Sequence, residues 1–288
     1  MELSIIILSY NTKALTLACI NSIVEEYKEE LLKEQFEVIV VDNASSDGSL
    51  SALKRITRKG IEVLESGENL GFSKGCNFGA KSARGKYLLF LNSDTVIKDQ
   101  GFLKMVDLLN KNENYGVLGG KLKNDDGTAQ PSTGRFYNLF TLFFMLLGLE
   151  RFGLLRESPK EIKEVDWVSG ACLMIKKSVF EKIGGFDKDI FMYTEDMELC
   201  YKAKKQGFKT YFFPEIMLYH KSLGSSNRAF AILNIYKGII LFYKTHKSKP
   251  EYLIAKFMLK LKAVILVVFG QIVNNKYLKE TYSQALKV

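Results

Sequence analysis

The sequence predicts an α/β fold, in which one twisted, mostly parallel sheet is flanked by helices and followed by a helical C-terminal extension. Over residues 3–91, four short apolar runs are separated by helical patterns. The run Tyr87–Leu91 stops abruptly at Asn92-Ser93-Asp94, which is typical of a strand covered on both faces of a parallel sheet. Strands separated by helices require crossover connections, and these connections are right-handed.

The elements follow in a clear order. We expect strands at 3–8, 38–41, 61–64 and 87–91, with helices near 15–27, after residue 43, and near 76–84. Residues 121–169 look rich in loops except for an apolar helix near 139–149, and a further strand is expected at 172–175.

A later helix is expected to begin near Thr194, whose side chain would cap it, and to end before Gly207. Beyond Ser226 the pattern is mainly helical. We therefore predict a domain over residues 1–226 and a helical extension over residues 227–288.

Composition narrows the classes of protein. With 288 residues, of which 47% are hydrophobic, the chain can bury a sizeable core and is not of the disordered class. The four cysteines form no C-x-x-C pair, which indicates neither a disulfide framework nor a zinc site. No secretory signal is expected, because the N-terminal apolar run Ile5–Leu8 is short and leads directly into polar residues. No run reaches the roughly 20 apolar residues of a membrane span. These features favour a cytoplasmic location with reduced thiols.

The net charge of +9 permits an anionic partner, whether nucleic acid, an anionic membrane or a phosphorylated substrate. The charge alone does not choose among them.

Two carboxylates stand at the ends of expected strands. Asp42 follows Val38–Val41 and Asp94 follows Tyr87–Leu91. Ligands of open α/β sheets bind outside the carboxyl ends of the strands, so both are candidates for a binding site. On position alone, Asp94 could equally cap a following helix or turn, and Asp47 is expected to be such a cap.

The segment E-N-L-G-F-S-K-G-C-N-F-G-A carries Gly71, Gly75 and Gly79. Glycines after a strand permit close approach of the backbone to a ligand, but close packing of a helix on the sheet explains this spacing as well. The segment matches neither the dinucleotide-binding nor the P-loop fingerprint.

The stretch F-M-Y-T-E-D-M-E-L-C crowds Glu195, Asp196 and Glu198 into the first turn of a helix. The helix dipole would stabilise acidic residues there, which is the structural explanation for them. Successive residues of a helix point about 100° apart, so only one of Glu195 and Asp196 is expected to face a substrate. His220 is one of two histidines, and a lone histidine more often has a structural role.

Taken together and in order, eight segments resemble the family-2 inverting glycosyltransferases of the GT-A fold. They read L-S-Y-N, V-V-D-N-A-S-S-D-G-S, E-N-L-G-F-S-K-G-C-N, L-N-S-D-T, V-S-G-A-C-L-M-I, G-G-F-D, Y-T-E-D-M-E-L-C and Y-H-K-S-L-G, and they cover roughly residues 3–226. Each is weak alone, but eight at compatible spacing form a strong signal. The L-N-S-D and G-G-F-D…F-M-Y-T-E-D forms are similar to the rhamnosyltransferase-like subgroup.

The resemblance implies an enzyme of cell-surface polysaccharide synthesis. It would move a sugar from a nucleoside-diphosphate sugar, with dTDP-rhamnose a candidate, to a hydroxyl of a glycan or polyprenyl-linked acceptor with inversion. No nucleic acid partner is implied. A non-catalytic nucleotide-sugar or glycan-binding protein on the same fold is the alternative, because a fold does not guarantee activity. A dehydrogenase is less consistent with the sequence, which lacks that fingerprint.

The resemblance also implies site residues. Asp42 would hydrogen-bond the nucleotide base, Asp196 would be the general base, and Asp94 and His220 would hold a divalent cation against the diphosphate. The donor pocket would comprise Ser9, Tyr10, Asn11, Asp42, Asn69, Gly71, Asn77, Asn92 and Ser93, and the acceptor would lie at Ser169, Gly170 and Glu195.

A bound cation stabilises the charge that develops on a departing diphosphate, and one carboxylate with one imidazole suits Mn²⁺ or Mg²⁺. Three positions depart from the family pattern. Asn92 replaces the first carboxylate of D-x-D, Glu198 replaces an Asp, and Lys202 replaces an Arg.

An apolar stripe marks the expected extension, flanked by lysines. Its members are Leu253, Ile254, Phe257, Met258, Leu261, Val264, Ile265, Val268 and Ile272, and the lysines are Lys256, Lys260 and Lys262. A helix packed on the protein's own core or on a second copy in a homodimer explains the stripe. So does a peripheral helix lying on anionic lipid at the inner face of the cell membrane.

Overall fold

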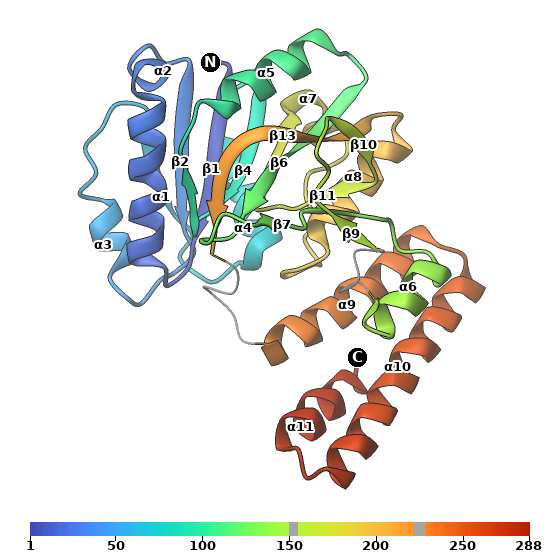
Figure 1. Cartoon of the computed structure of the whole chain (residues 1–288). Coiled ribbons are helices and arrows are strands. Elements are labelled where there is room, and N and C mark those ends of the chain that lie inside the picture. The colour runs from blue at the N-terminus through green and yellow to red at the C-terminus, as the bar shows by residue number, and fades with distance from the viewer. Residues whose placement is uncertain (150–154, 222–227) are drawn as a thin grey trace.

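The computed structural model describes residues 1–149, 155–221 and 228–288 (Figure 1). The strands are β1 (Leu3–Ser9), β2 (Phe36–Asp42), β3 (Ile61–Glu65), β4 (Tyr87–Asn92), β5 (Thr95–Ile97), β6 (Tyr115–Lys123), β7 (Ala129–Gln130), β8 (Thr133–Gly134), β9 (Arg156–Glu157), β10 (Lys163–Val165), β11 (Trp167–Val168), β12 (Cys172–Lys176) and β13 (Lys209–His220). The helices are α1 (Lys13–Glu26), α2 (Lys28–Leu32), α3 (Ser49–Leu53), α4 (Gly71–Ser82), α5 (Gly101–Lys111), α6 (Leu139–Leu146), α7 (Lys177–Lys182), α8 (Glu195–Lys205), α9 (Arg228–His246), α10 (Lys249–Ile272) and α11 (Lys276–Ala285). The predicted α/β order is confirmed.

One ten-stranded sheet organises the molecule. Its path runs β10-β13-β6-β12-β4-β1-β2-β3, with β5 paired to β13 and β7 to β6, and β11-β8-β9 form a separate small sheet. Strands β4, β1, β2 and β3 are mutually parallel, as predicted. Strand β12 runs antiparallel between β4 and β6, so its first residue, Cys172, lies beside Leu91 near the end of β4. The loop that precedes β12 therefore reaches the carboxyl edge of the parallel strands.

Helices cover both faces of the sheet, because successive side chains of a strand point to opposite faces. Ile5 and Ile7 of β1 share one apolar core with α1 and α5, whereas Ile6 shares the other with α4 and α8. All four cysteines are buried and unpaired.

Helices α9, α10 and α11 belong to the same core as α4 and α8. They contribute Tyr236, Leu259 and Tyr282 to it. Figure 1 shows these helices beyond the carboxyl ends of β1 and β4. The predicted boundary at 226/227 and the residues Ser222-Leu223-Gly224 of Y-H-K-S-L-G lie outside the described residues. Among the helices of the described ranges, none is both long and apolar enough to cross a membrane.

The start of α8 differs from the prediction. Thr194 does precede the helix, but its backbone is left-handed, with φ of 73°, and its side chain makes no capping hydrogen bond. The hydroxyl instead lies against Gly238 of α9. The expected end is confirmed, since Gly207 has φ of 84° and its N–H donates to the Lys204 carbonyl.

Candidate active site

A pocket of about 860 Å³ opens at the carboxyl ends of β1 and β4. Its lining includes eleven of the predicted site residues: Tyr10, Asn69, Gly71, Asn92, Ser93, Asp94, Ser169, Gly170, Glu195, Asp196 and His220. Strand ends, a loop and a helix start bring these distant segments together.

Strand pairing explains why Asp94 and His220 meet. Strand β13 runs antiparallel to β5 and sets His220 opposite Thr95, immediately after Asp94. The N–H of Lys221 donates to the Asp94 carbonyl at 3.1 Å. Because β5 rather than a helix follows Asp94, the helix-cap alternative for this residue is not supported.

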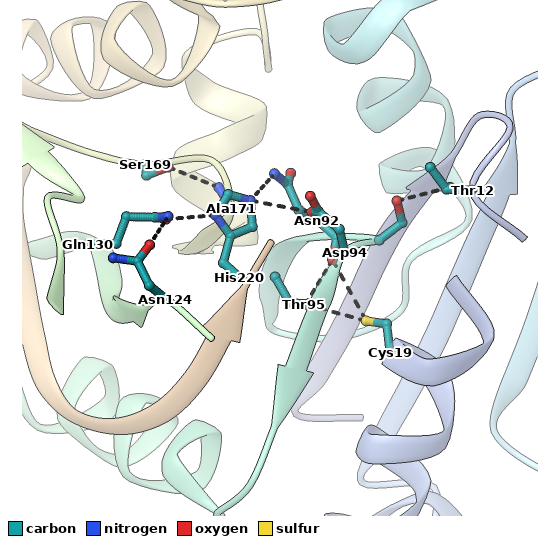
Figure 2. A network of polar contacts seen from close by, with 11 residues as sticks. Thr12, Cys19, Asn92, Asp94, Thr95, Asn124, Gln130, Ser169, Ala171 and His220 are labelled. Carbon is teal, nitrogen blue, oxygen red and sulfur yellow. Dashed lines mark hydrogen bonds and ion pairs between the residues drawn. The ribbon is translucent and has the colours of Figure 1, made fainter. Parts of the chain in front are cut away.

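The His220 ring is held by polar contacts on both nitrogens (Figure 2). Its Nδ1 lies 2.7 Å from Gln130 Oε1, and its Nε2 lies 3.1 Å from Asn92 Nδ2 and 3.3 Å from Asp94 Oδ1. An amide oxygen only accepts and an amide nitrogen only donates, so Nδ1 donates to Gln130 and Nε2 accepts from Asn92, beside Asp94. Metal-binding histidines commonly use this arrangement, in which the second nitrogen donates to a protein oxygen.

The pair Asp94 and His220 fits a cation that a substrate helps to hold. Within the described residues, no three His, Cys, Asp or Glu side chains cluster as a complete protein-only metal site. Mg²⁺ is commonly bound through one or two carboxylates together with substrate phosphates. One carboxylate and one correctly oriented imidazole therefore suit a site that a diphosphate completes.

Two carboxyl groups meet at the start of α8. Asp196 Oδ2 accepts the N–H of Gly170 at 3.1 Å, and its Oδ1 accepts the N–H of Met197 at 2.7 Å. Glu195 is buried, and its Oε2 has no partner among the described residues. Both residues line the pocket, and the expectation that only one of them faces a substrate stays a prediction. The pocket wraps around the N-terminal end of the helix.

The surroundings of the Glu195 and Asp196 carboxyl groups differ. Burial, and then the nearby charge of Asp196, raises the pKa of Glu195 to about 8. Burial also raises the pKa of Asp196, but two N–H donors and the Arg156 guanidinium favour its charged form. Of the two groups, Asp196 is therefore the one whose charged form, the form that a general base requires, is stabilised by hydrogen-bond donors.

The turn before α8 is strained. Tyr193 and Thr194 both have left-handed backbones, with φ of 67° and 73°, and such residues cost about 1–3 kcal/mol each. Close packing holds the turn, because the N–H of Phe72 donates to the Phe191 carbonyl at 2.6 Å and Gly238 contacts Thr194. Strain of this kind clusters at functional sites.

The three glycines of the 68–80 segment divide into two roles. Gly71 has φ of 73°, and a Cβ there would lie 2.6 Å from the Phe191 carbonyl oxygen. Cβ atoms at Gly75 and Gly79 would instead meet Leu8 and Ile6 of β1 at 2.5 and 2.8 Å. Helix–sheet packing therefore accounts for Gly75 and Gly79, and the pocket wall accounts for Gly71.

Four predicted residues lie outside the lining of the pocket: Ser9, Asn11, Asp42 and Asn77. The Asn77 amide is committed to the backbone N–H and carbonyl of Phe186, at 3.0 and 2.8 Å. Asn11 Oδ1 accepts from the Ser46 N–H, and Ser9 Oγ lies 3.0 Å from Thr16 Oγ1. Asp42 is fully buried; Oδ2 accepts the Ser45 N–H, while Oδ1 has no partner within the described chain. Their roles at the donor stay predictions.

Sequence reasoning missed Gln130, Arg156 and Trp167, all of which line the pocket. Among the described lining residues, Arg156 is the sole lysine or arginine. Its guanidinium lies 5.2 Å from the centroid of the Trp167 ring and donates to the Pro131 carbonyl at 3.2 Å. The one visible signal was the chain's single tryptophan, two residues before Ser169.

Comparison with known proteins agrees with this geometry. The model of the family "Glycosyl transferase family 2" matches residues 4–184. A low-salt glycan biosynthesis hexosyltransferase of Haloferax volcanii is 30% identical over 59% of this chain, which spans 54% of that relative. An N-acetylglucosaminyl-diphospho-decaprenol L-rhamnosyltransferase of Mycobacterium tuberculosis is 26% identical over 66% of this chain and 68% of its own length. The chain thus spans about half to two thirds of these relatives.

Solved structures show the same fold. The Pyrobaculum calidifontis mannosyltransferase PcManGT, in complex with GDP-Man and Mn²⁺, has a TM-score of 0.60 at 15% identity over 99% of this chain and 85% of its own. S. aureus TarS residues 1–349 give 0.57 at 16% identity over 99% and 92%. These likenesses confirm the predicted GT-A fold.

Proposed function

The chain belongs to glycosyl transferase family 2, and from that premise we propose that it transfers a sugar from a nucleoside-diphosphate sugar to an acceptor hydroxyl with inversion. The acceptor is a glycan or a polyprenyl-linked glycan of cell-surface polysaccharide synthesis. The mycobacterial relative, a rhamnosyltransferase with a decaprenol-linked acceptor, supports rhamnose as the sugar and a lipid-linked acceptor, and dTDP-rhamnose is the donor that we propose. The proposed location is the cytoplasm, at the inner face of the cell membrane, where the four unpaired cysteines stay reduced.

The observation that carries the proposal is the placement of Asp196 in the same pocket as Asp94 and His220. Asp94 and His220 would hold Mn²⁺ or Mg²⁺, which when bound offsets the charge of the diphosphate leaving group. Arg156 supplies a second positive charge to the pocket and suits a phosphate-bearing substrate.

The chemistry that remains for the chain is proton transfer. The acceptor oxygen forms a bond to the anomeric carbon as the bond from that carbon to the diphosphate oxygen breaks. Asp196 takes the proton of the acceptor hydroxyl, and the nucleoside diphosphate leaves with the bonding electron pair. Gly170 fixes the Asp196 carboxylate through its N–H, so that the base is oriented before the acceptor binds.

Incubation with a panel of nucleotide sugars, with and without glycan acceptors, tests the proposal. An enzyme releases nucleoside diphosphate from one donor in step with transfer. A non-catalytic binding protein would be protected from thermal unfolding by a donor without releasing any nucleoside diphosphate, and that result would favour the alternative function.

A further inference from the structure

The net positive charge of the molecule lies at the C-terminal end of the chain. Residues 227–288 contain eleven lysines and arginines but only two acidic residues, Glu251 and Glu280. Residues 1–226 contain thirty basic and thirty acidic residues, so the net charge of +9 resides in the last 62 residues. The helices at that end therefore form a cationic region beside a neutral α/β domain.

Helix α10 has two opposite faces. Ala255, Leu259, Ala263 and Gly270 are its buried residues and pack on the core. The opposite face carries exposed apolar residues three or four positions apart: Leu253, Ile254, Phe257, Leu261, Val264, Ile265, Val268, Phe269 and Ile272. Phe257 is 65% exposed and Ile272 is 77% exposed. A contiguous row of such exposed apolar side chains is unusual on a soluble protein. We call these nine residues the outer face of α10.

Lysines border one edge of the outer face in the N-terminal half of α10. Lys249, Lys256 and Lys260 lie along one edge of the helix, at angular positions next to Leu253 and Val264. The single acid of α10, Glu251, is engaged in the capping box with Ser248 at the start of the helix. The outer face is thus apolar in the middle and cationic at its border, which is the pattern of a helix that lies in a lipid interface.

A neighbouring helix adds exposed aromatic residues. Helix α6 packs against α10, and Phe140 and Phe143 on α6 are 71% and 49% exposed. Exposed apolar side chains on two adjacent helices form a larger patch than the scattered apolar surface residues of a typical soluble domain.

We propose that the outer face of α10, together with Phe140 and Phe143, docks the protein on the surface of an anionic lipid bilayer. The apolar side chains enter the boundary between headgroups and acyl chains, and the bordering lysines contact anionic headgroups. About 36 Å of helix lies along the surface, since each residue adds about 1.5 Å. The proposal rests on the proposed function in one respect only, namely that the enzyme meets a lipid-linked acceptor at the membrane surface.

The position of the pocket fits this docking. Helix α9 lines the pocket with Phe230 and Ile235 and packs against α10. One helix therefore separates the active site from the docking face. In a homodimer joined through the outer face, the lysines of the two copies would face each other. The repulsion between them disfavours a second copy as the partner of this face.

Flotation of the full chain with vesicles of phosphatidylglycerol and phosphatidylcholine, without any substrate, tests the docking. We expect flotation with the anionic vesicles at low salt, little with phosphatidylcholine alone, and partial release by salt. The pair Lys256→Glu and Lys260→Glu should lower partitioning at least about 10-fold. Lys28→Glu with Lys81→Glu, the same charge change at exposed positions of the α/β domain, should leave it unchanged.

Phe257→Ser should also lower partitioning, whereas Leu32→Ser, at an exposed leucine of α2, should not. Failure of the wild type to float at low salt would overturn the docking. So would a dimer in light scattering that Phe257→Ser converts to a monomer, because the outer face would then join two copies. Release of nucleoside diphosphate with a water-soluble acceptor, measured separately, tells failure of docking from failure of the enzymatic proposal.

Discussion

His246 Nε2 of α9 lies 3.0 Å from Glu198 Oε1 of α8, and both side chains are buried. The other carboxylate oxygen of Glu198 lies 3.2 Å from Lys202 Nζ, which also donates to the Gly185 carbonyl at 2.6 Å. Two of the three positions that depart from the family pattern, Glu198 and Lys202, thus belong to one network. This network joins the helix that carries Asp196 to the C-terminal helices.

His246→Ala should destabilise the protein because it leaves the buried Glu198 carboxylate with one partner fewer. A lost hydrogen bond to a buried charged group costs about 1–3 kcal/mol, which corresponds to a drop in Tm of roughly 2–5 °C for a chain of 288 residues. Thermal unfolding of the variant beside Lys244→Ala, an exposed lysine on the same helix, checks this. Equal Tm values for His246→Ala and Lys244→Ala would show that the contact contributes nothing.

Removal of the cation should weaken donor binding as well as transfer. With EDTA we expect donor affinity, measured by calorimetry, to fall at least about 10-fold and to recover with Mn²⁺ or Mg²⁺, because the diphosphate loses its counter-charge. Asp94→Ala should bind donor equally weakly with and without metal, whereas Asp125→Ala, at an exposed carboxylate, should behave as wild type. Unchanged donor affinity in EDTA would remove Asp94 and His220 from the role of ligands.

Glu195 should make stability depend on pH. Its pKa is raised from 4.5 to about 8 in the folded protein, so the folded state holds this proton more tightly than the unfolded state does. The stabilising contribution is complete below pH 4.5 and is lost as pH rises through about 8. Between pH 6 and pH 9 the fall in Tm should therefore be smaller in Glu195→Gln, by roughly 3–5 °C. Glu62→Gln, at an exposed position of β3, is the control, and parallel Tm curves for wild type and Glu195→Gln would contradict the raised pKa.

Arg156 should contribute to binding of a phosphate-bearing substrate. Arg156→Ala should lower kcat/KM at least about 10-fold, because a charge-assisted contact to phosphate is lost. Arg156→Lys should recover only part of this, since lysine keeps the charge but loses the planar fork that lies over Trp167. Arg135→Ala, at an exposed arginine outside the pocket lining, is the matched control. No difference between the Arg156→Ala and Arg135→Ala variants would rule out this role.

The strand ends were predictable from the sequence because their chemistry is local. Apolar runs that stop at polar residues located Asp94 and Asn92, and parallel strands bring their carboxyl ends to one edge. His220 and Gly170 required the resemblance to the family, because neither lies in a pattern that shows which distant strand it meets. Their meeting with β4 and β5 depends on the antiparallel pairing of β12 and β13.

The missed residues come from segments without periodicity. Strands β8, β9 and β11 have two residues each, too few to show alternation, yet their pairing brings Arg156 and Trp167 to the pocket. The error at Thr194 has a similar origin. A threonine before an acidic turn is typical of a cap, but Thr194 has a left-handed backbone and its hydroxyl lies against Gly238, a residue of a helix distant in sequence.

The central claim is that Asp196 accepts the proton of the acceptor hydroxyl, and one paired measurement tests it most directly. Asp196→Asn keeps the shape of the side chain and removes its basicity, so donor affinity and the rate of transfer should be measured in the same preparation, with Glu195→Gln alongside. We expect Asp196→Asn to bind donor as wild type does while transfer falls at least about 10²-fold, the usual scale of general-base catalysis. Transfer by Asp196→Asn at near the wild-type rate, with Glu195→Gln inactive, would contradict the claim and make Glu195 the base.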